Sequence, residues 1–379
     1  MRALVESVPN FAVGFRDGAI RASLASAAAV SGATVLDSSF DSDHSRLVLS
    51  LGLPTPHPAD SVFAVAAAAV ELIDLRSHAG VHPRRGAADV VPFVPVGSAS
   101  LSDCVVLARE LGERVWAELG VPVHFYGAAA TGVRTLAEIR SASPPPPDLG
   151  DEPHPSAGVM SIGARLPLVA YNVLLDGIRL PEAHALARSL RESSGGVRGI
   201  QALVFEVSSG IQLSMNLTRL GECGPARAMT ETLVRLPPAA SVRSEEVVGL
   251  CPAAAAAGCA AADGKLLEAR LAGCAARLAA TACAARGVGS EEMRRLGERL
   301  ASEAASLDGL GFGEALAGAE RAAALRRVLR AGGVAAPEAD LLLAVASEGL
   351  RAALPTAVKG AFPERLAALD RWLREDSAG

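Results

Sequence analysis

The first 180 residues alternate two kinds of segment, and this alternation constrains the fold more than any other feature of the sequence. Short apolar runs typical of strands are separated by stretches in which apolar residues recur at helical spacing. Strands and helices that alternate in this way build a layered α+β structure, in which we expect the helices to cover one face of a sheet. The predicted strands are Leu4–Val8, Thr34–Leu36, Leu47–Leu51, Val91–Val96 and Val121–Phe125, and the predicted helices are Gly18–Ser31, Asp60–His78 and Leu101–Leu119.

A proline-rich segment follows at residues 141–155. Four consecutive prolines and several acidic residues give it the composition of extended, solvated chain. Beyond it, the pattern of apolar residues indicates a second α+β unit. The predicted elements of that unit are a long strand at Gly163–Leu175, a helix at Pro181–Glu192, paired strands at Ile200–Val207 and Gln212–Leu217, and a helix at Glu222–Leu236.

From about residue 260 the composition becomes helical throughout, without the β-branched runs typical of strands. The fold class that these patterns predict is α+β, with two tandem α/β sandwich subdomains followed by an all-helical C-terminal region. We place the domain boundaries at 1–179, 180–272 and 273–379. The helices expected in the last region lie around Leu267–Leu278 and Met293–Leu307, and at Glu314–Arg330, Pro337–Leu354 and Pro363–Glu375.

Charge and hydropathy narrow the class of partner. The formal net charge of −5 argues against nucleic acid, because such a partner requires a clustered Lys/Arg surface. Apolar runs at Val65–Leu72 and Ala253–Ala262 are far shorter than the roughly 20 residues of a membrane span. Glu6 also interrupts the start before a signal peptide could form. We therefore expect a cytoplasmic protein that acts on small molecules, with no nucleic-acid or membrane partner.

Neither the cysteines nor the aspartates indicate a metal site. The six cysteines contain no C-x-x-C pair, so we expect buried thiols. Several carboxylates and imidazoles early in the chain are hard metal ligands in principle, but their spacing matches no closed metal motif. We expect a polar loop at the mouth of a site instead, and the residues concerned are Asp37, Asp41, Asp43, His44 and His57.

One loop gathers the side chains that suit acid–base chemistry. Residues 76–89 contain two histidines, three arginines and one aspartate, between a predicted helix and the strand Val91–Val96. An imidazole that titrates near neutral pH can both accept and return a proton, and guanidinium groups can orient carboxylates. The loop therefore suits a reaction on an acidic amine or amide. A solvated loop without catalytic function would have the same composition, because most loop residues are not catalytic.

This loop and several other segments resemble the formiminotransferase family, whose activity is often fused to a cyclodeaminase. Residues 82–89 resemble the family's His-Pro-Arg-Met-Gly-Ala-Leu-Asp segment, and Val8–Phe11 resembles its opening motif. Residues 36–46 are similar to an Asp-rich segment that ends in His-Asn-Arg. Matches continue in family order to about residue 270, at Pro92–Val96, Gly120–Val123, Tyr126-Gly127, Gly163–Arg165, Ala170–Asn172, Gln201-Ala202, Asn216-Leu217 and Val247–Pro252.

The resemblance implies a glutamate formimidoyltransferase, an activity of histidine degradation and one-carbon metabolism. Such an enzyme moves a formimidoyl group between N-formimidoyl-L-glutamate and N5 of tetrahydrofolate, which is a co-substrate. The match carries the general acid/base role to His82 and not to His78. It also implies that residues 1–179 are the family's N-terminal subdomain and that 180–272 are a shortened C-terminal subdomain. No cyclodeaminase motif opens the helical tail.

The family's strand that begins Gly-Ala-Arg lines the folate site. In that strand Arg165 is hard to explain as core, and Tyr171 and Asn172 could offer a pterin an aromatic face and hydrogen bonds. Arg46 and Arg84 suit clamping of glutamate carboxylates, although surface ion pairing would use them equally well. The candidate substrate residues are Asn10, Arg46 and Arg84, and the candidate folate residues are Gly163, Ala164, Arg165, Leu166, Pro167, Leu168, Val169, Ala170, Tyr171 and Asn172.

Several positions depart from the family pattern and leave the substrate open. Val13 stands in place of a Glu, Ser45 in place of an Asn, Ala128 in place of a Glu, and Arg219 in place of an acidic residue. A formyl donor, or folate binding without turnover as a scaffold, would fit the same residues. A third interpretation is a helical interaction protein in which the tail matters most. That tail could form a homodimer or cap the transferase core.

Overall fold

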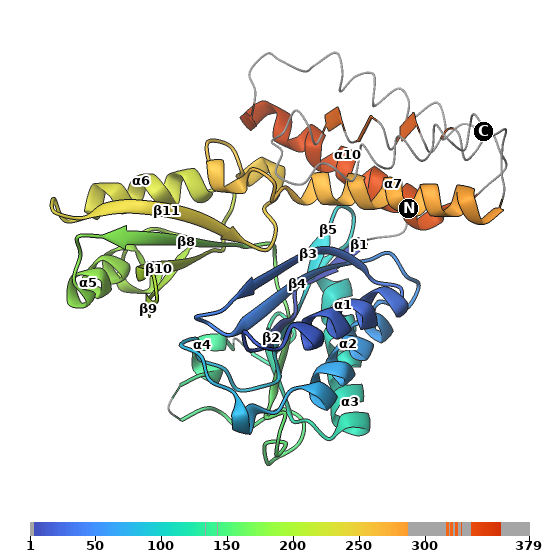
Figure 1. Ribbon diagram of the computed structural model, residues 1–379, viewed down its shortest axis with the longest axis horizontal. Coiled ribbons are helices and arrows are strands. Elements are labelled where there is room, and N and C mark those ends of the chain that lie inside the picture. The colour runs from blue at the N-terminus through green and yellow to red at the C-terminus, as the bar shows by residue number, and fades with distance from the viewer. Residues whose placement is uncertain are drawn as a thin grey trace.

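The computed structural model describes residues 4–132, 134–141, 143–286, 316–317, 319–320, 323–324, 327 and 335–357. Within these ranges the chain forms a seven-stranded sheet, a four-stranded sheet and helices that pack on both (Figure 1). We call residues 4–164 the first unit, 169–248 the second unit, and the chain from Leu267 onward the C-terminal region. This mixture of sheets and helices confirms the expected α+β class.

The sheet of the first unit is built around an interrupted N-terminal strand. β1 (Leu4–Ser7) and β2 (Asn10–Ala12) lie end to end, because each pairs antiparallel with both β4 (Arg46–Leu53) and β5 (Ala88–Val96). Pro9, which cannot donate a ladder hydrogen bond, lies at the interruption. The remaining strands are β3 (Thr34–Asp41), which pairs with β4, and β7 (Met160–Ala164), which runs parallel to β5 and β6 (Val123–Gly127).

Three helices cover one face of this sheet, as the sequence predicts. Leu24, Val65 and Leu111 project from the three helices into a core that also contains Phe11 and Phe93 from the strands. Burial of these large side chains is the main favourable contribution to the stability of the first unit. The helices are α1 (Gly18–Val30), α2 (Pro58–Leu72) and α3 (Leu101–Leu119); a 3-10 turn at Leu75–Ser77 follows α2, and the short α4 (Leu136–Ile139) follows β6.

The second unit is an antiparallel sheet in the order β11-β8-β10-β9 with two helices on one face. Tyr171 and Leu213 from the strands pack there against Leu186 and Ala228 from the helices. Side chains alternate along a strand, so the neighbouring residues lie on the other face, which we call the open face. The open face includes Asn172, Leu174, Leu203, Phe205, Gln212 and Ser214. The elements are β8 (Val169–Asp176), α5 (Leu180–Leu190), β9 (Ile200–Val207), β10 (Gly210–Leu217), α6 (Pro225–Arg235) and β11 (Ser241–Val248).

The long strand expected at Gly163–Leu175 is divided between the two sheets. Its first residues end β7 in the first sheet, residues 165–168 form a link that contains Pro167, and the rest forms β8 in the second sheet. The expectation of a single strand is therefore wrong, and the two units separate at 165–168 rather than at 179/180. The apolar pattern does not reveal the break, because β7 and β8 are both largely buried.

The sequence pattern also fails to predict β11. This strand lies at the edge of its sheet, and most of its residues are polar and at least partly exposed. An edge strand with few buried residues lacks the apolar alternation on which strand prediction depends. β9, by contrast, has the bounds that its apolar run predicts.

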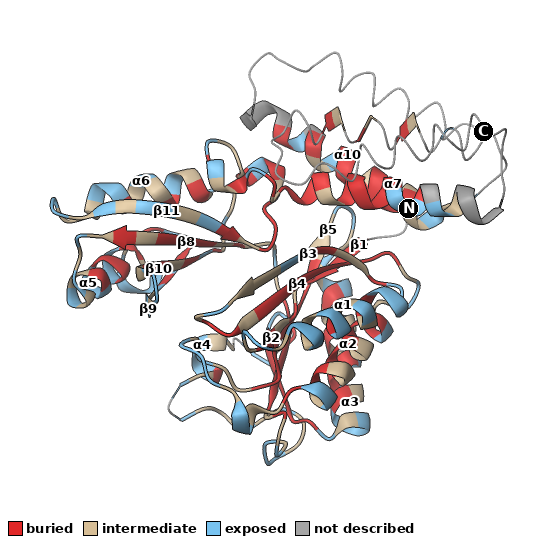
Figure 2. Cartoon of the chain, in the orientation of Figure 1, coloured by how far each residue is buried: buried red, intermediate tan, exposed pale blue. Residues whose placement is uncertain are grey.

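α7 and α10 of the C-terminal region pack on part of the face of the first sheet that lies opposite α1, α2 and α3. α7 (Leu267–Arg286) and α10 (Pro337–Ala357) lie side by side (Figure 1), and Figure 2 shows α7 buried over much of its length. Leu271 and Leu342 from these helices share one core with Leu4 and Leu36 from the sheet. α7 spans the expected boundary at 272/273. The helices expected at Met293–Leu307 and Pro363–Glu375 lie outside the described residues, and only a few positions of Glu314–Arg330 lie inside them.

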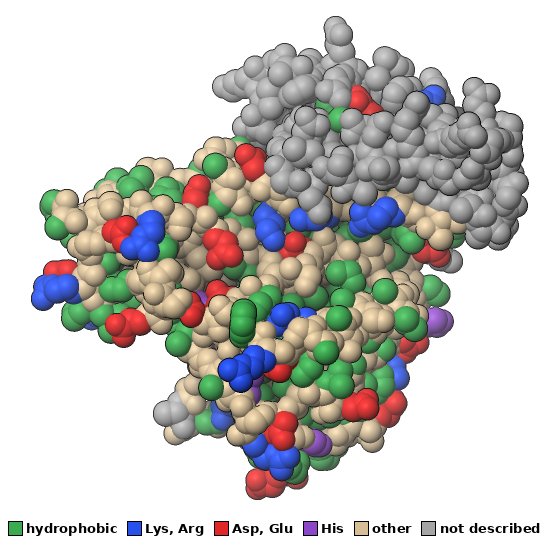
Figure 3. Space-filling view, in the orientation of Figure 1, with side chains coloured by type: hydrophobic (Ala, Val, Ile, Leu, Met, Phe, Trp, Pro, Cys, Tyr) green, Lys and Arg blue, Asp and Glu red, His purple; other side chains and the backbone are tan. Residues whose placement is uncertain are grey.

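Two features of the structure concern the class of partner: the distribution of charged side chains on the surface and the hydropathy of the helices. Figure 3 shows acidic and basic side chains interspersed over the visible face of the two units. In the part of the chain that the structure describes, no helix combines the length and the hydropathy that crossing a bilayer requires.

Deletion of the chain from Gly287 onward removes α10 and should expose the side of α7 that α10 covers. Leu271 and Ala275 are buried in the shared core, so the truncated protein gains an apolar patch. We expect both units to stay folded but the truncated chain to self-associate or lose solubility. Light scattering on the two proteins measures this change. A truncated chain with the size distribution of the full-length chain would contradict the covering role of α10.

Candidate active site

The loop between the 3-10 turn and β5 is held in place by one of its own arginines, Arg84. The guanidinium of Arg84 donates to the carbonyl oxygens of His78 at 2.9 Å, Gly80 at 3.1 Å and His82 at 3.2 Å. Gly80 lies against the turn between β3 and β4, where a Cβ atom would stand 2.6 Å from the carbonyl oxygen of His44. The backbone of this loop is therefore closely packed, and this packing fixes the direction in which the side chain of His82 points.

A buried carboxylate, that of Asp89, joins three segments beneath this loop. Its Oδ2 atom accepts from Nη1 of Arg46 at 3.1 Å and from Nη2 of Arg140, and its Oδ1 atom accepts from the backbone N–H of Arg85 at 2.8 Å. Burial would raise the pKa of Asp89, but Arg46 and Arg140 hold it below its usual value. Arg46 is positioned further by Asn10, whose Oδ1 accepts from Nε at 3.0 Å.

The imidazole of His82 lies at the edge of this charged cluster. Its Nδ1 atom is 2.7 Å from the carbonyl oxygen of Pro83 and 3.1 Å from Nη1 of Arg46. A carbonyl can only accept and a guanidinium can only donate, so the two contacts require opposite states of Nδ1. The shorter contact assigns a proton to Nδ1, and this leaves Nε2 as the basic nitrogen.

The pKa of His82 differs from the value that its residue type predicts. Burial, together with the charges of Arg46 and Arg140, lowers this pKa from 6.5 to about 3, although Asp89 and the Pro83 carbonyl act in the opposite direction. The pKa of His82 in the protein without bound substrate is therefore shifted away from the neutral range in which a free imidazole titrates. The imidazole is neutral at physiological pH.

The second unit closes over the same imidazole. The ring of Phe205 on β9 stacks on the ring of His82, with 5.7 Å between centroids and 29° between planes, and meets His44 edge-on at 5.0 Å. The turn after β9 is tied to the first unit, because the backbone N–H and hydroxyl of Ser208 donate to Asp43 at 3.1 and 2.8 Å. Phe205 could not be assigned to the site from sequence, since an aromatic residue in a strand usually indicates core.

Comparisons with known proteins identify this arrangement. Residues 4–165 match the family model described as the formiminotransferase domain, N-terminal subdomain. The glutamate formimidoyltransferase of Streptococcus pyogenes serotype M1 is 36% identical over 272 residues, which cover 67% of this chain and 91% of that protein. The chain belongs to the formiminotransferase family of transferases. The family match ends where the link between the two units begins.

Two further relatives show how far this family likeness extends. The glutamate formimidoyltransferase of Thermoplasma acidophilum is 36% identical over 271 residues, which cover 66% of this chain and 88% of that protein. The formimidoyltransferase-cyclodeaminase of Gallus gallus is 36% identical over 282 residues, but these cover only 51% of that longer protein. The likeness therefore spans both units, whereas about half of the Gallus gallus protein lies outside the match.

The structure brings together three of the residues that the sequence proposes for the site. Asn10, Arg46 and His82 form one connected cluster. Arg84 lies next to it, but its guanidinium is used by three backbone carbonyls of its own loop, so its role as a carboxylate clamp is not supported. Nε2 of His78 is buried and, within the described residues, makes no hydrogen bond.

The candidate folate residues of this family member do not form one surface. Gly163 and Ala164 lie in the first sheet, residues 165–168 lie in the link, and the rest lie in the second sheet. Tyr171 is fully buried among the helices of the second unit, and its hydroxyl donates to Glu245. The expectation that its ring faces a pterin is therefore wrong. Asn172 lies on the open face and donates to Glu246 at 3.4 Å.

The three aspartates and the histidine of residues 37–44 lie close to polar groups of the protein. Asp37 pairs with Lys265 at 3.1 Å, Nδ1 of His44 is 3.0 Å from Asp41, and Asp43 accepts from Ser208. Over the described ranges of the chain, no group of three or more His, Cys, Asp and Glu side chains could hold a metal ion. These residues act in the structure as contacts between segments.

Replacement of Asp89 by Asn should strongly destabilise the protein. The substitution leaves two partly buried guanidinium groups without their counterion, and breaking such a buried pair costs about 3–5 kcal/mol. Because the folded-state pKa of Asp89 is lowered, its contribution is present above the unfolded-state pKa and is lost as the pH falls towards the folded-state pKa. Urea unfolding of both proteins between pH 7 and pH 3 measures the difference.

Asp74→Asn is the matched control for this prediction. Asp74 also pairs with an arginine, Arg76, but this pair is exposed and should contribute little. We expect the Asp89 variant to differ from the parent at pH 7 and to approach it at low pH. Equal stability of the two Asn variants at pH 7 would show that the buried cluster does not hold the site together.

Proposed function

We propose that the protein transfers a formimidoyl group from N-formimidoyl-L-glutamate to N5 of tetrahydrofolate, with His82 as the general acid/base. The carrying observation is the imidazole of His82, whose Nδ1 lies 2.7 Å from the Pro83 carbonyl oxygen and 3.1 Å from the guanidinium of Arg46; the shorter contact leaves Nε2 as the nitrogen that can act as a base. The chain is also 36% identical to two proteins named glutamate formimidoyltransferase. Tetrahydrofolate is the proposed co-substrate, and the reaction requires no metal.

The proposed reaction needs one group to make two proton transfers. The N5 amine of tetrahydrofolate attacks the amidine carbon, which forms the new N–C bond and gives a tetrahedral species. Nε2 of His82 takes the proton from the attacking nitrogen and returns a proton to the nitrogen of glutamate. The bond between the carbon and that nitrogen then breaks, and glutamate leaves as a neutral amine. One positioned imidazole can perform both transfers, because the same nitrogen is base in the first step and acid in the second.

We place the folate on the open face of the second sheet, opposite the His82 loop. Asn172 pairs across the ladder with Ser214, and Gln212 pairs with Phe205, so polar and apolar side chains alternate over this face. Leu203 is 52% exposed there, and Nε2 of Gln212 is buried and makes no hydrogen bond within the described residues. A flat ligand with hydrogen-bonding edges suits such a surface. Ala170 and Asn172 remain in the proposed site, whereas Tyr171 leaves it.

The departures from the family pattern have local structural roles. Ser45 has a φ of 46°, and Asn, the residue expected there, tolerates this left-handed conformation well. Val13 is fully buried in the core of the first unit, and Arg219 pairs with Glu192 at 3.7 Å. Ser45 thus lies in a turn, Val13 in the core and Arg219 in an ion pair on the surface. They leave the acid/base cluster unchanged, and this favours transfer over folate binding without turnover.

His82→Ala should abolish most of the transfer. Removal of a general acid/base lowers the rate by about 10²–10⁴-fold, and His82 contributes no large apolar surface to a core. His78→Ala in the same loop should cost much less and controls for damage to the loop. The measurement is formimidoyl transfer from formiminoglutamate to tetrahydrofolate, with folate binding titrated in the same preparations. Near-parental turnover of His82→Ala would refute the catalytic assignment, and folate binding without turnover in the parent would favour the scaffold interpretation.

Asn172→Ala and Tyr171→Phe test the placement of folate, since the two residues are neighbours on opposite faces of β8. Loss of one hydrogen bond at Asn172 should weaken the binding of a 5-substituted tetrahydrofolate by about 3- to 10-fold. Tyr171→Phe removes a buried hydrogen bond with Glu245 and should lower the stability of the second unit while folate affinity stays the same. Isothermal titration and thermal unfolding measure the two effects. The placement is wrong if Tyr171→Phe weakens folate binding and Asn172→Ala does not.

A further inference from the structure

We propose that Arg140 is a positioning residue for the reaction: through Asp89 it holds Arg46 against His82, and its charge keeps the imidazole neutral until an acidic substrate binds. This inference rests on the proposed function, in which His82 moves the protons. Arg140 touches neither the imidazole nor, in our proposal, the reacting atoms. It acts through the carboxylate that it shares with Arg46.

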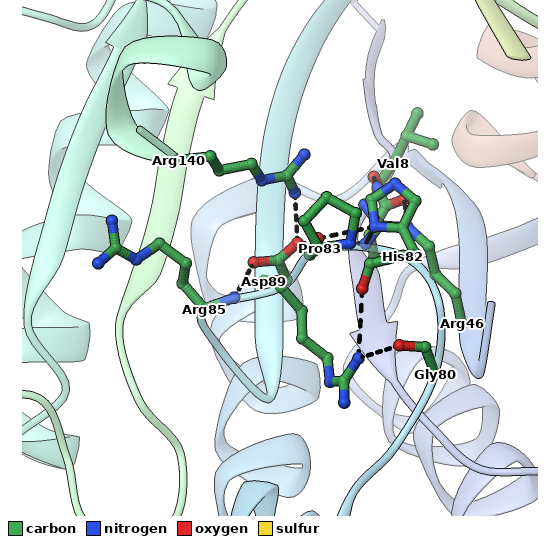
Figure 4. Close-up of polar contacts among 10 residues, drawn as sticks. Val8, Arg46, Gly80, His82, Pro83, Arg85, Asp89 and Arg140 are labelled. Atoms are coloured by element: carbon green, nitrogen blue, oxygen red, sulfur yellow. Dashed lines mark hydrogen bonds and ion pairs between the residues drawn. The ribbon is translucent and has the colours of Figure 1, made fainter. Parts of the chain in front are cut away.

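The contacts of Asp89 show how Arg140 reaches the site (Figure 4). The same oxygen, Oδ2, accepts from both Arg46 and Arg140, while Oδ1 is occupied by the backbone N–H of Arg85. The carboxylate is only 1% exposed, and the side chains of Arg46 and Arg140 are 16% and 20% exposed. Two guanidinium groups thus share one anion, and the cluster carries one excess positive charge next to His82. A site that served only to hold the loop would need just one of them.

This excess charge acts on the nitrogen that the reaction uses. The Pro83 carbonyl assigns one proton to Nδ1, and a second proton on Nε2 would make an imidazolium ion 3.1 Å from the Arg46 guanidinium. Burial and the charges of Arg46 and Arg140 lower the pKa of His82 to about 3, against the effect of Asp89. The other rings that face the imidazole are those of Phe205 and His44. After burial, the excess guanidinium charge is therefore the second influence that lowers the basicity of this imidazole.

The class of substrate explains what an excess positive charge could do. A substrate that carries carboxylates, such as an N-substituted glutamate, brings negative charge to Arg46 or Arg140 and offsets the excess. The imidazole then becomes a stronger base only when the acidic substrate is present, because a neighbouring anion favours the protonated form. A neutral amidine without carboxylates would leave His82 a weak base. Arg140 would in this way couple recognition of an acidic substrate to proton transfer.

The test compares Arg140→Met, which removes the charge and keeps an apolar stem, with Arg140→Lys, which retains the charge. The titration of His82 is followed by nuclear magnetic resonance of histidine-labelled protein without substrate, and His82→Gln assigns the signal. In the parent we expect His82 to stay neutral to the lowest pH at which the protein is folded. In Arg140→Met its midpoint should rise by at least about one pH unit, and in Arg140→Lys it should remain close to the parent. Arg46 and Asp89 remain paired one to one in the Met variant, so we expect it to fold.

Kinetics then separate this inference from the proposed function. The acid limb of kcat/KM should move to higher pH in Arg140→Met and not in Arg140→Lys. An unchanged His82 midpoint in Arg140→Met overturns the inference, whether or not the protein is active. A midpoint raised in Arg140→Met but not in Arg140→Lys, with no transfer by the parent or either variant, would keep the electrostatic role and refute the proposed function. If Arg140→Met does not fold, Arg140→Gln, which keeps a donor for Asp89 without the charge, gives the same comparison.

Discussion

The buried carboxylate of Asp89 is the interaction on which the geometry of the candidate site depends. It lies at the start of β5 and binds Arg46 from β4, Arg140 after α4, and the backbone N–H of Arg85 in the loop between them. Arg46 in turn reaches Asn10 on β2. Four segments that are far apart in the sequence are therefore fixed relative to one another by one charge. A buried ion must be paired to be tolerated, so these segments can take only a few arrangements.

Contacts at both ends of the second unit hold it over this cluster. At one end Phe205 stacks on His82 and the Ser208 turn is tied to Asp43. At the other end Lys265, which follows the second unit, pairs with the buried Asp37 in β3. The open face of the second sheet is thus held opposite the catalytic loop from both ends. A ligand between the units would contact polar side chains of one sheet and the imidazole of the other unit.

Prediction from sequence succeeded where burial leaves a periodic pattern and failed where it does not. α1, α3 and β9 have apolar periodicity and appear close to their expected bounds, whereas α2 ends at Leu72, six residues before the expected His78. β11 was missed because a polar edge strand has no such pattern. The strand at Gly163–Leu175 was drawn as one element because buried strands of different sheets have the same composition. Tyr171 was assigned to the site because the family resemblance marks a continuous run of residues, whereas a one-residue alternation decides which face of β8 a side chain occupies.

The sequence by itself determined the α+β class, a helical C-terminal region and the family, and it named Asn10, Arg46 and His82 as candidate site residues. These features depend on local composition and on short motifs, which can be recognised in the sequence without knowledge of the fold. Only the tertiary structure decided that Arg84 serves its own loop, that Phe205 covers the imidazole, and that Arg140 shares Asp89 with Arg46. It also decided that the pKa of His82 lies far below that of a free imidazole. The reason is physical: burial and charge depend on distance in space, and the residues that set them come from segments whose proximity no local pattern encodes.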